Sequence, residues 1–227
     1  MEYVISPPEA VSLPIVGESK RFPVRRIYCV GRNYVAHIRE MGGDERDLPF
    51  YFTKPADAIV QNGGTMDYPP QTSNMHYEIE LVVAIGKGGK NIAEADALNH
   101  IYGYAVGLDM TRRDVQIALR EKGRPWDMGK AFDQSAPCAE IHPVSQVGHI
   151  SKGDIWLKVN GETKQNSDLE LMIWNVPETI ANLSGLVELA PGDLIFTGTP
   201  DGVGPVVSGD KMHGHVEGLT DLNISVR

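Results

Sequence analysis

Three carboxylates in this chain have the residue type and spacing of a metal site. Glu78 and Glu80 stand two apart in an otherwise apolar, strand-like run, and Asp109 follows a second apolar run. A carboxylate buried without a partner is costly, so such a group usually becomes neutral, pairs with a cation or binds a metal. Because side chains on a strand alternate between faces, Glu78 and Glu80 are expected to project to the same side. Two oxygen donors would then face one point.

The ligand types narrow the choice of metal. With Asp109 added, the set consists of oxygen donors without cysteine, which suits a hard cation such as Mg²⁺ or Mn²⁺ rather than zinc. An alternative is that Glu78 and Glu80 line the solvated face of a half-buried strand, where polar and apolar residues normally alternate. From the pair alone, both interpretations stay open.

A candidate general base lies upstream of these acids. His37 and Glu40 are three apart in a segment with helical spacing, 34–41, so they share a helix face. A glutamate that accepts a hydrogen bond from imidazole fixes its tautomer and raises its basicity, as a general base requires. A solvated His–Glu pair on a helix surface is the alternative.

Other polar residues could contact an anion. Lys130 stands between small and apolar residues, which suits a substrate contact, although an exposed turn lysine would look the same. Thr199 lies in the glycine-rich run 197–205, which lacks the Gly-Lys-Ser/Thr ending of a phosphate-binding loop. Its backbone amides and the Thr199 hydroxyl could still bind a carboxylate.

The elements that must position these residues are mostly strands. Strands outnumber helices and do not alternate with them regularly, which favours a β-rich α+β domain. We expect a lead-in segment at 1–23, a single domain at 24–227 and, at 44–49, a charged loop that could act as a lid. Predicted strands are 27–30, 50–52, 58–60, 77–85, 155–159 and 194–196, and predicted helices are 34–41, 94–99, 111–122 and 174–186, the last with Pro177 in its first turn.

Composition excludes several classes of protein. A hydrophobic fraction of 41% and a charged fraction of 22% are ordinary for a soluble globular domain. The formal net charge of −9 argues against a nucleic-acid or membrane-surface binder. The two cysteines are far apart in sequence, and neither a signal peptide nor an apolar run of roughly 18 residues is visible. We therefore expect a cytoplasmic protein without a disulfide framework.

Several short motifs, in one order along the chain, together resemble the fumarylacetoacetate hydrolase family, in particular its acylpyruvate hydrolase branch. The resemblance covers the chain from about residue 24 to its end. The matching segments are 30–34 with His37 and 40–41, 52–55, 76–81, 103–104, 108–111, 113–116, 129–133, 157–162 and 197–204.

The resemblance implies a fold and a set of roles. It implies a β-rich roll that is usually assembled as a homodimer. It also implies that a divalent cation is bound by Glu78, Glu80 and Asp109, that His37 and Glu40 activate water, that Lys130 lies beside the metal, and that Arg32, Arg113, Gln116 and Thr199 contact substrate.

The implied reaction is cleavage of a carbon–carbon bond. Water deprotonated by His37, oriented by Glu40, would attack C4 of a metal-chelated 2,4-dioxo acid and expel a pyruvate enolate, whose charge the cation and Lys130 stabilise. The branch points to fumarylpyruvate, an intermediate of gentisate-type aromatic breakdown, as the acylpyruvate substrate. Its distal carboxylate could meet Arg39 or Arg46.

Two other functions stay open at this point. The same metal site could decarboxylate oxaloacetate or tautomerise a 2-oxo acid without an attacking water. A function of another class is a non-catalytic module that binds a metal or a 2-oxo acid. The presence of His37, Glu40 and Lys130 together favours an enzyme.

Overall fold

The strand that carries Glu80 is the centre of the largest sheet. The computed structural model describes residues 2–34 and 47–227. Strand β8 (Ile79–Ile85) is buried along its whole length, between β9 (Ile101–Leu108) and β15 (Leu194–Phe196), and pairs antiparallel with both. Glu80 is only 1% exposed, so the alternative of a solvated strand face is wrong.

The eight-stranded sheet extends from β8 in both directions. Its order is β4-β3-β15-β8-β9-β11-β5, and a short strand, β12, also pairs with β9. The remaining strands of this sheet are β3 (Ile27–Gly31), β4 (Phe50–Lys54), β5 (Ile59–Gln61), β11 (Ala136–Cys138) and β12 (His142–Pro143). The expected strand 58–60 begins at Ile59, because Ala58 ends a preceding 3₁₀ turn.

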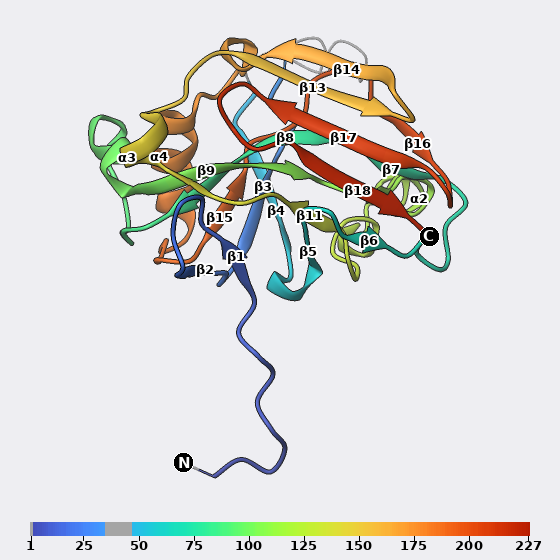
Figure 1. Cartoon of the computed structure of the whole chain (residues 1–227), viewed down its shortest axis with the longest axis horizontal. Helices are drawn as coiled ribbons and strands as arrows, with labels where there is room; N and C mark the ends of the chain where they lie inside the picture. The colour runs from blue at the N-terminus through green and yellow to red at the C-terminus, as the bar shows by residue number, and fades with distance from the viewer. Residues whose placement is uncertain (1, 35–46) are drawn as a thin grey trace.

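A five-stranded sheet packs across one face of the large sheet (Figure 1). Its order is β14-β13-β17-β18-β6, and buried and more exposed residues alternate along β13 and β17. This alternation means that one face is buried and the other solvated. The larger hydrophobic core lies between the two sheets. The strands are β6 (Thr65–Met66), β13 (Asp154–Val159), β14 (Glu162–Asp168), β17 (Lys211–Val216) and β18 (Leu222–Val226).

A third sheet interrupts one predicted strand. It consists of β10 (Thr111–Arg112), β7 (Met75–Tyr77) and β16 (Gly204–Val206), in that order. The prediction of one continuous strand over residues 77–85 is therefore wrong. The chain pairs in the small sheet up to Tyr77, passes through Glu78 and enters the large sheet at Ile79.

Within the described residues the helices are few and short, so the expected β-rich α+β fold is confirmed. Helix α4 begins in a capping box formed by Asn175 and Glu178, with Pro177 in its first turn. The expected helix 111–122 starts later because Thr111 and Arg112 pair with β7, and the expected helix 94–99 is a 3₁₀ helix. The helical elements are α2 (Arg113–Glu121), α3 (Val144–Val147), α4 (Val176–Leu186), η1 (Ala56–Ala58), η2 (Glu94–His100), η3 (Asp127–Gly129) and η4 (Leu169–Leu171).

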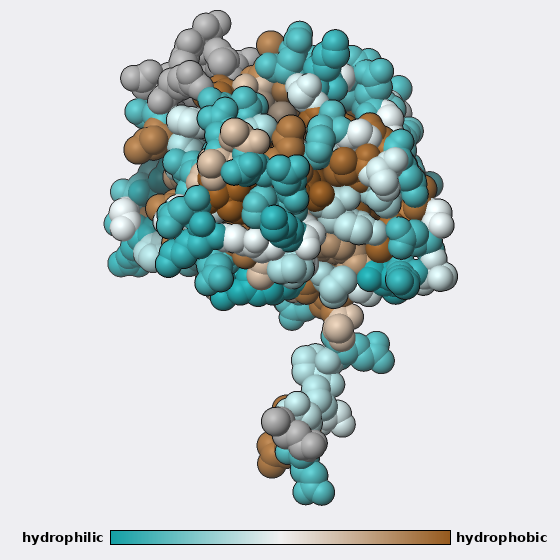
Figure 2. Space-filling view, turned by 90° about the vertical axis from the view of Figure 1, so that its left-hand side faces the viewer, coloured by the Kyte–Doolittle hydropathy of each residue, from teal (hydrophilic) through white to brown (hydrophobic). Residues whose placement is uncertain are grey.

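The first residues extend away from the body of the protein, and β1 (Ser12–Pro14) then pairs with β2 (Arg21–Pro23) (Figures 1 and 2). This hairpin buries Leu13 and Phe22 in a smaller core on the other face of the large sheet. Both cysteines are buried and free. Most of the expected helix 34–41 and half of the expected loop 44–49 lie outside the described residues. In the described part of the chain, every helix is too short or too polar to cross a bilayer.

Asn33 connects three segments that surround the candidate site. Its buried amide donates to the carbonyl oxygens of Trp174 (2.9 Å) and Thr197 (2.7 Å), and its Oδ1 accepts from the Trp174 amide at 2.7 Å. These bonds join the end of β3 to the end of β15 and to the start of α4. Asn33 therefore fixes the backbone from which Arg32 and Thr199 project.

Replacing Asn33 by Ala should lower the free energy of unfolding by about 2–4 kcal/mol, because three hydrogen bonds in a buried site are lost together. Urea unfolding followed by circular dichroism measures the change. Asn166→Ala is the matched control, since Asn166 is exposed on β14, and it should have little effect. Equal stability of the two variants would show that the hydrogen bonds of Asn33 do not hold these segments together.

Candidate active site

The three acids singled out from the sequence meet at one buried point. Glu78 lies between β7 and β8, Glu80 is on β8, and Asp109 directly follows β9. The Asp109 amide donates to the Glu78 carbonyl at 2.9 Å, which continues the β8–β9 pairing. One oxygen of each carboxylate lies within 4.8 Å of the others, and the residues are 6%, 1% and 0% exposed in chain order.

Two buried lysines neutralise much of this negative charge. Lys130 Nζ donates to Glu78 Oε2 at 2.7 Å and to Asp109 Oδ2 at 2.6 Å. Burial disfavours the ammonium of Lys130, but Asp109 and Glu78 outweigh it, so the pKa of Lys130 is raised. Lys54 Nζ lies 2.8 Å from Asp109 Oδ1 and donates to the carbonyl oxygens of Met110, at 3.0 Å, and Lys130. Lys54 was missed by sequence reasoning, although it lies in one of the matching segments.

Arg113 is the third cation beside the carboxylates, and its guanidinium contacts other residues of the site. It forms an ion pair with Glu78, donates from Nη1 to Gln116 Oε1 at 2.6 Å and reaches His76 Nδ1 at 3.5 Å. Burial, Arg113 and Lys130 lower the pKa of His76 to about 4, so this imidazole is neutral at pH 7. These contacts make Arg113 a residue that orients Glu78 and Gln116. The structure does not test the predicted contact of Arg113 with substrate.

The carboxylates fit a divalent cation. The buried Asp109 Oδ1 has no hydrogen-bond partner even though Lys54 is close, so a lone pair is left for a ligand. Burial, followed by the charges of Asp109 and Glu78, raises the pKa of Glu80 well above its usual range. A cation between the three groups would relieve this repulsion and favour the ionised form of Glu80. An all-oxygen donor set suits Mg²⁺ or Mn²⁺.

The loop after β15 supplies hydrogen bonds to the same point. The Gly198 amide donates to Glu80 Oε2 at 2.8 Å. Gly198 has φ +94°, and a Cβ there would lie 2.6 Å from the Cβ of Asn33, so only glycine fits. Thr199 is buried and its hydroxyl accepts from Gln165 Nε2 at 2.9 Å, which leaves the Thr199 proton for a ligand.

Gln165 is a buried side chain on an otherwise mostly exposed strand, β14. Its Oε1 accepts from the Ile79 amide at 3.0 Å, and its Nε2 donates to Thr199 Oγ1 and to the Pro200 carbonyl, each at 2.9 Å. It therefore ties the backbone between the two glutamates to the glycine-rich loop. The run 162–168 is polar throughout, so no pattern in the sequence distinguishes Gln165 from its neighbours.

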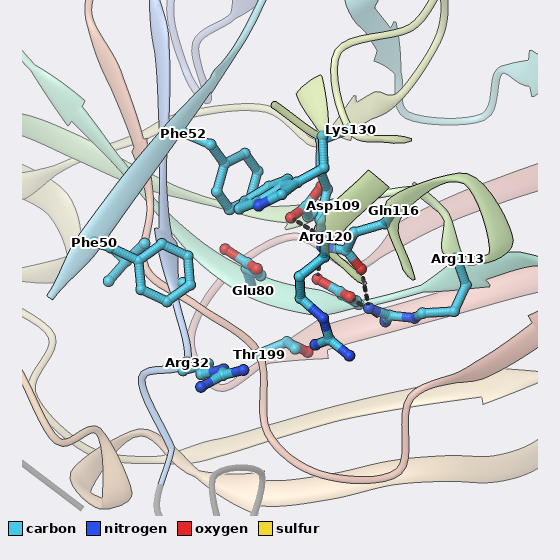
Figure 3. Close-up of a pocket in the computed structure, with 14 residues that line it drawn as sticks. Arg32, Phe50, Phe52, Glu80, Asp109, Arg113, Gln116, Arg120, Lys130 and Thr199 are labelled. Atoms are coloured by element: carbon cyan, nitrogen blue, oxygen red, sulfur yellow. Dashed lines mark hydrogen bonds and ion pairs between the residues drawn. The ribbon is translucent and has the colours of Figure 1, made fainter. Parts of the chain in front are cut away.

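A pocket with a volume of about 280 Å³ opens onto the carboxylates (Figure 3). The predicted substrate contacts Arg32, Gln116 and Thr199 line it, together with Arg113 and Lys130. His37 and Glu40 lie outside the described residues, so the structure does not test the predicted dyad. Lining residues that sequence reasoning did not select are Val30, Gly31, Phe50, Phe52, Arg120 and Trp126.

Comparison with known proteins agrees with this geometry. The family model for the fumarylacetoacetate hydrolase C-terminal region matches residues 26–227. The chain belongs to the fumarylacetoacetate hydrolase family. The resemblance read from the motifs is thereby confirmed.

Individual members of the family differ in activity. The chain is 55% identical to a fumarylpyruvate hydrolase of Ralstonia sp over 177 residues, which cover 78% of this chain and 92% of the relative. It is 40% identical to the mitochondrial oxaloacetate tautomerase of Homo sapiens, with 89% and 91% covered. A crystal structure of the fumarylpyruvate hydrolase of Pseudomonas aeruginosa, in complex with Mn²⁺ and pyruvate, superposes with a TM-score of 0.97 at 56% identity, with 99% of each chain covered.

Metal binding should stabilise the protein through the carboxylate site. At a free Mn²⁺ concentration about 100 times Kd, the free energy of unfolding should rise by about 2.7 kcal/mol. Thermal unfolding of the protein with Mn²⁺, and again after EDTA has removed the metal, measures this change. Glu80→Gln keeps the shape of the side chain but removes a charged ligand, so it should lose most of this gain. Glu162→Gln, at an exposed position, should retain it. An equal gain in both variants would exclude Glu80 as a ligand.

Proposed function

We propose that this enzyme is a metal-dependent hydrolase that cleaves the carbon–carbon bond of an acylpyruvate, with fumarylpyruvate as substrate and pyruvate and fumarate as products. The observation that carries the proposal is the buried triad of Glu78, Glu80 and Asp109 with Lys130 bonded to two of its members. The similarity to fumarylpyruvate hydrolases over nearly the whole chain supports the choice of substrate.

The proposed cofactor is Mg²⁺ or Mn²⁺, held by Glu78, Glu80 and Asp109. Such a cation, when bound, supplies Lewis-acid polarisation of the substrate's oxo group and a positive charge beside the leaving group. Lys130 adds a second positive charge at the same point, because its ammonium is held against two of the carboxylates. A buried, preorganised cation stabilises developing negative charge far better than water does.

Two neutral donors are left to orient the substrate. Gln116 Oε1 accepts from Arg113, so the amide protons of Gln116 remain available among the described contacts. The hydroxyl of Thr199 accepts from Gln165 and can donate its proton. Both side chains line the pocket, where they can bind the carboxylate and oxo oxygens of a 2-oxo acid. Holding the substrate in one orientation lowers the barrier by removing its freedom of motion.

The attacking water is activated, in this proposal, by His37 with Glu40 as its orienting partner. His37 takes a proton from water as the oxygen attacks C4 of the dioxo acid. The bond between C3 and C4 then breaks, its electron pair leaves with the pyruvate fragment as an enolate, and a proton at C3 completes pyruvate. Lys130 stabilises the enolate charge, which makes carbon a tolerable leaving group.

A second activity at the same site is tautomerisation or decarboxylation of oxaloacetate. The 40% identity to an oxaloacetate tautomerase favours including it, since both reactions also pass through an enolate of a 2-oxo acid. Neither of these reactions needs an attacking water. A non-catalytic binding module is the third possibility. Burying a charged lysine between two of the proposed ligand carboxylates costs desolvation free energy, and binding alone does not require that lysine.

The cellular setting forms part of the proposal. A cytoplasmic homodimer that acts in aromatic catabolism fits the resemblance to acylpyruvate hydrolases. Light scattering measures the oligomeric state and tests the homodimer.

A substrate panel tests the reaction class. With Mg²⁺ or Mn²⁺, fumarylpyruvate should be hydrolysed with a kcat/KM at least about 10 times that for loss of oxaloacetate, because only the acylpyruvate uses the water-activating base. Loss of the dioxo-acid absorbance measures the first reaction, and release of CO₂ or enol formation measures the second. Turnover of oxaloacetate without hydrolysis of any acylpyruvate would overturn the hydrolase assignment.

Replacing His37 by Ala should lower kcat for acylpyruvate hydrolysis by about 10² or more while metal binding stays nearly intact. Decarboxylation of oxaloacetate should fall less, because it needs no base. His149→Ala is a control, since His149 does not line the pocket and instead hydrogen-bonds to the Tyr104 hydroxyl. Full turnover in the His37 variant would rule out the dyad.

A further inference from the structure

The inner part of the pocket holds equal numbers of carboxylates and cations. Lys54 and Lys130 contact Asp109, and Arg113 and Lys130 contact Glu78, whereas the donor to Glu80 is the Gly198 amide. A divalent cation would therefore leave this region with a net positive charge. One carboxylate of a substrate, bound there, offsets part of that charge.

Two further arginines line the pocket outside this balanced region. Arg120 projects from α2 on the same helix face as Arg113 and Gln116, at spacings of seven and four residues. Arg32 projects from the turn after β3, where it has φ +58°, a conformation that few residues other than glycine adopt. Neither guanidinium has a hydrogen-bond or ion-pair partner within residues 2–34 and 47–227.

The two arginines lie at one side of the pocket. Figure 3 shows the Arg120 side chain extending past the carboxylates towards the region of Thr199 and Arg32. Arg120 is exposed and Arg32 is half-buried, so water can solvate both guanidiniums, and an anion bound between or beside them would gain a favourable interaction with each. A carboxylate suits this position because guanidinium groups bind carboxylates through paired hydrogen bonds.

Another part of the pocket is aromatic, and it includes Phe50, which pairs with Gly31 next to Arg32. Trp126 packs edge-on against Phe50, with ring centroids 6.2 Å apart, and against Phe52, with centroids 5.2 Å apart. Phe50 and Phe52 face the cavity across from Arg120 in Figure 3. Flat, unsaturated groups pack well against such rings. The space between the carboxylates and the two arginines therefore suits a planar acyl chain that ends in a charge.

We propose that Arg120, assisted by Arg32, binds the distal carboxylate of the acyl group and makes the enzyme selective for dianionic acylpyruvates. This inference rests on the proposed acylpyruvate hydrolysis and adds the residues that select among acylpyruvates. The three aromatic rings hold the unsaturated part of the acyl chain. An acylpyruvate with a neutral acyl group, such as acetylpyruvate, leaves Arg120 unpaired and gains nothing from it.

The test compares fumarylpyruvate with acetylpyruvate in the full-length protein loaded with Mn²⁺. Arg120→Gln should raise KM for fumarylpyruvate by about tenfold or more with little change in kcat, because a charge-assisted contact made equally in ground and transition states is lost. KM for acetylpyruvate should change by less than about twofold, since it makes no such contact. Arg120→Lys, which keeps the charge but not the paired geometry, should restore part of the affinity.

Arg124→Gln is the matched control, because it removes the same charge from an exposed position just beyond α2 that does not line the pocket. It should leave both substrates unaffected. If wild-type protein hydrolyses both substrates and Arg120→Gln changes their KM values equally or not at all, Arg120 does not select the acyl group and this inference is wrong. If wild-type protein hydrolyses neither substrate, the proposed function itself fails.

Discussion

The burial of three carboxylates around one point is the constraint on which the rest of the site depends. Glu78, Glu80 and Asp109 are nearly inaccessible to water, and their mutual repulsion adds to the cost of desolvating each. This cost is offset by Lys130, which contacts Glu78 and Asp109, and by the Gly198 amide, which donates a hydrogen bond to Glu80. Asp109 Oδ1 forms an ion pair with Lys54 but accepts no hydrogen bond, so a lone pair of this oxygen is left that a divalent cation would use.

The architecture explains how such a costly arrangement is held. The chain leaves the small sheet at Tyr77 and enters the large sheet at Ile79, so Glu78 sits at the junction of two pairing systems. Gln165 reaches this junction from the five-stranded sheet and also holds the loop that carries Thr199. Three sheets therefore converge on the carboxylates, and none of them alone could position all the donors and acceptors.

The pocket divides into regions with different tasks. The inner region, with its carboxylates and paired cations, is suited to stabilising an enolate whatever the rest of the substrate. The outer region, with Arg32, Arg120 and three aromatic rings, makes none of the ion pairs of the inner region and lies where the acyl group would bind.

Local sequence determined the β-rich class, the shared side of Glu78 and Glu80, and the start of α4 at Asn175 and Pro177, because strand alternation and helix capping depend on near neighbours. The family motifs, and not spacing, joined Asp109 to the glutamates. Only the tertiary structure decided that Thr111 pairs in a sheet, that Lys54 contacts Asp109 and that Gln165 bonds to Ile79. These contacts join residues dozens of positions apart, and their energy depends on burial and pairing that no local pattern records.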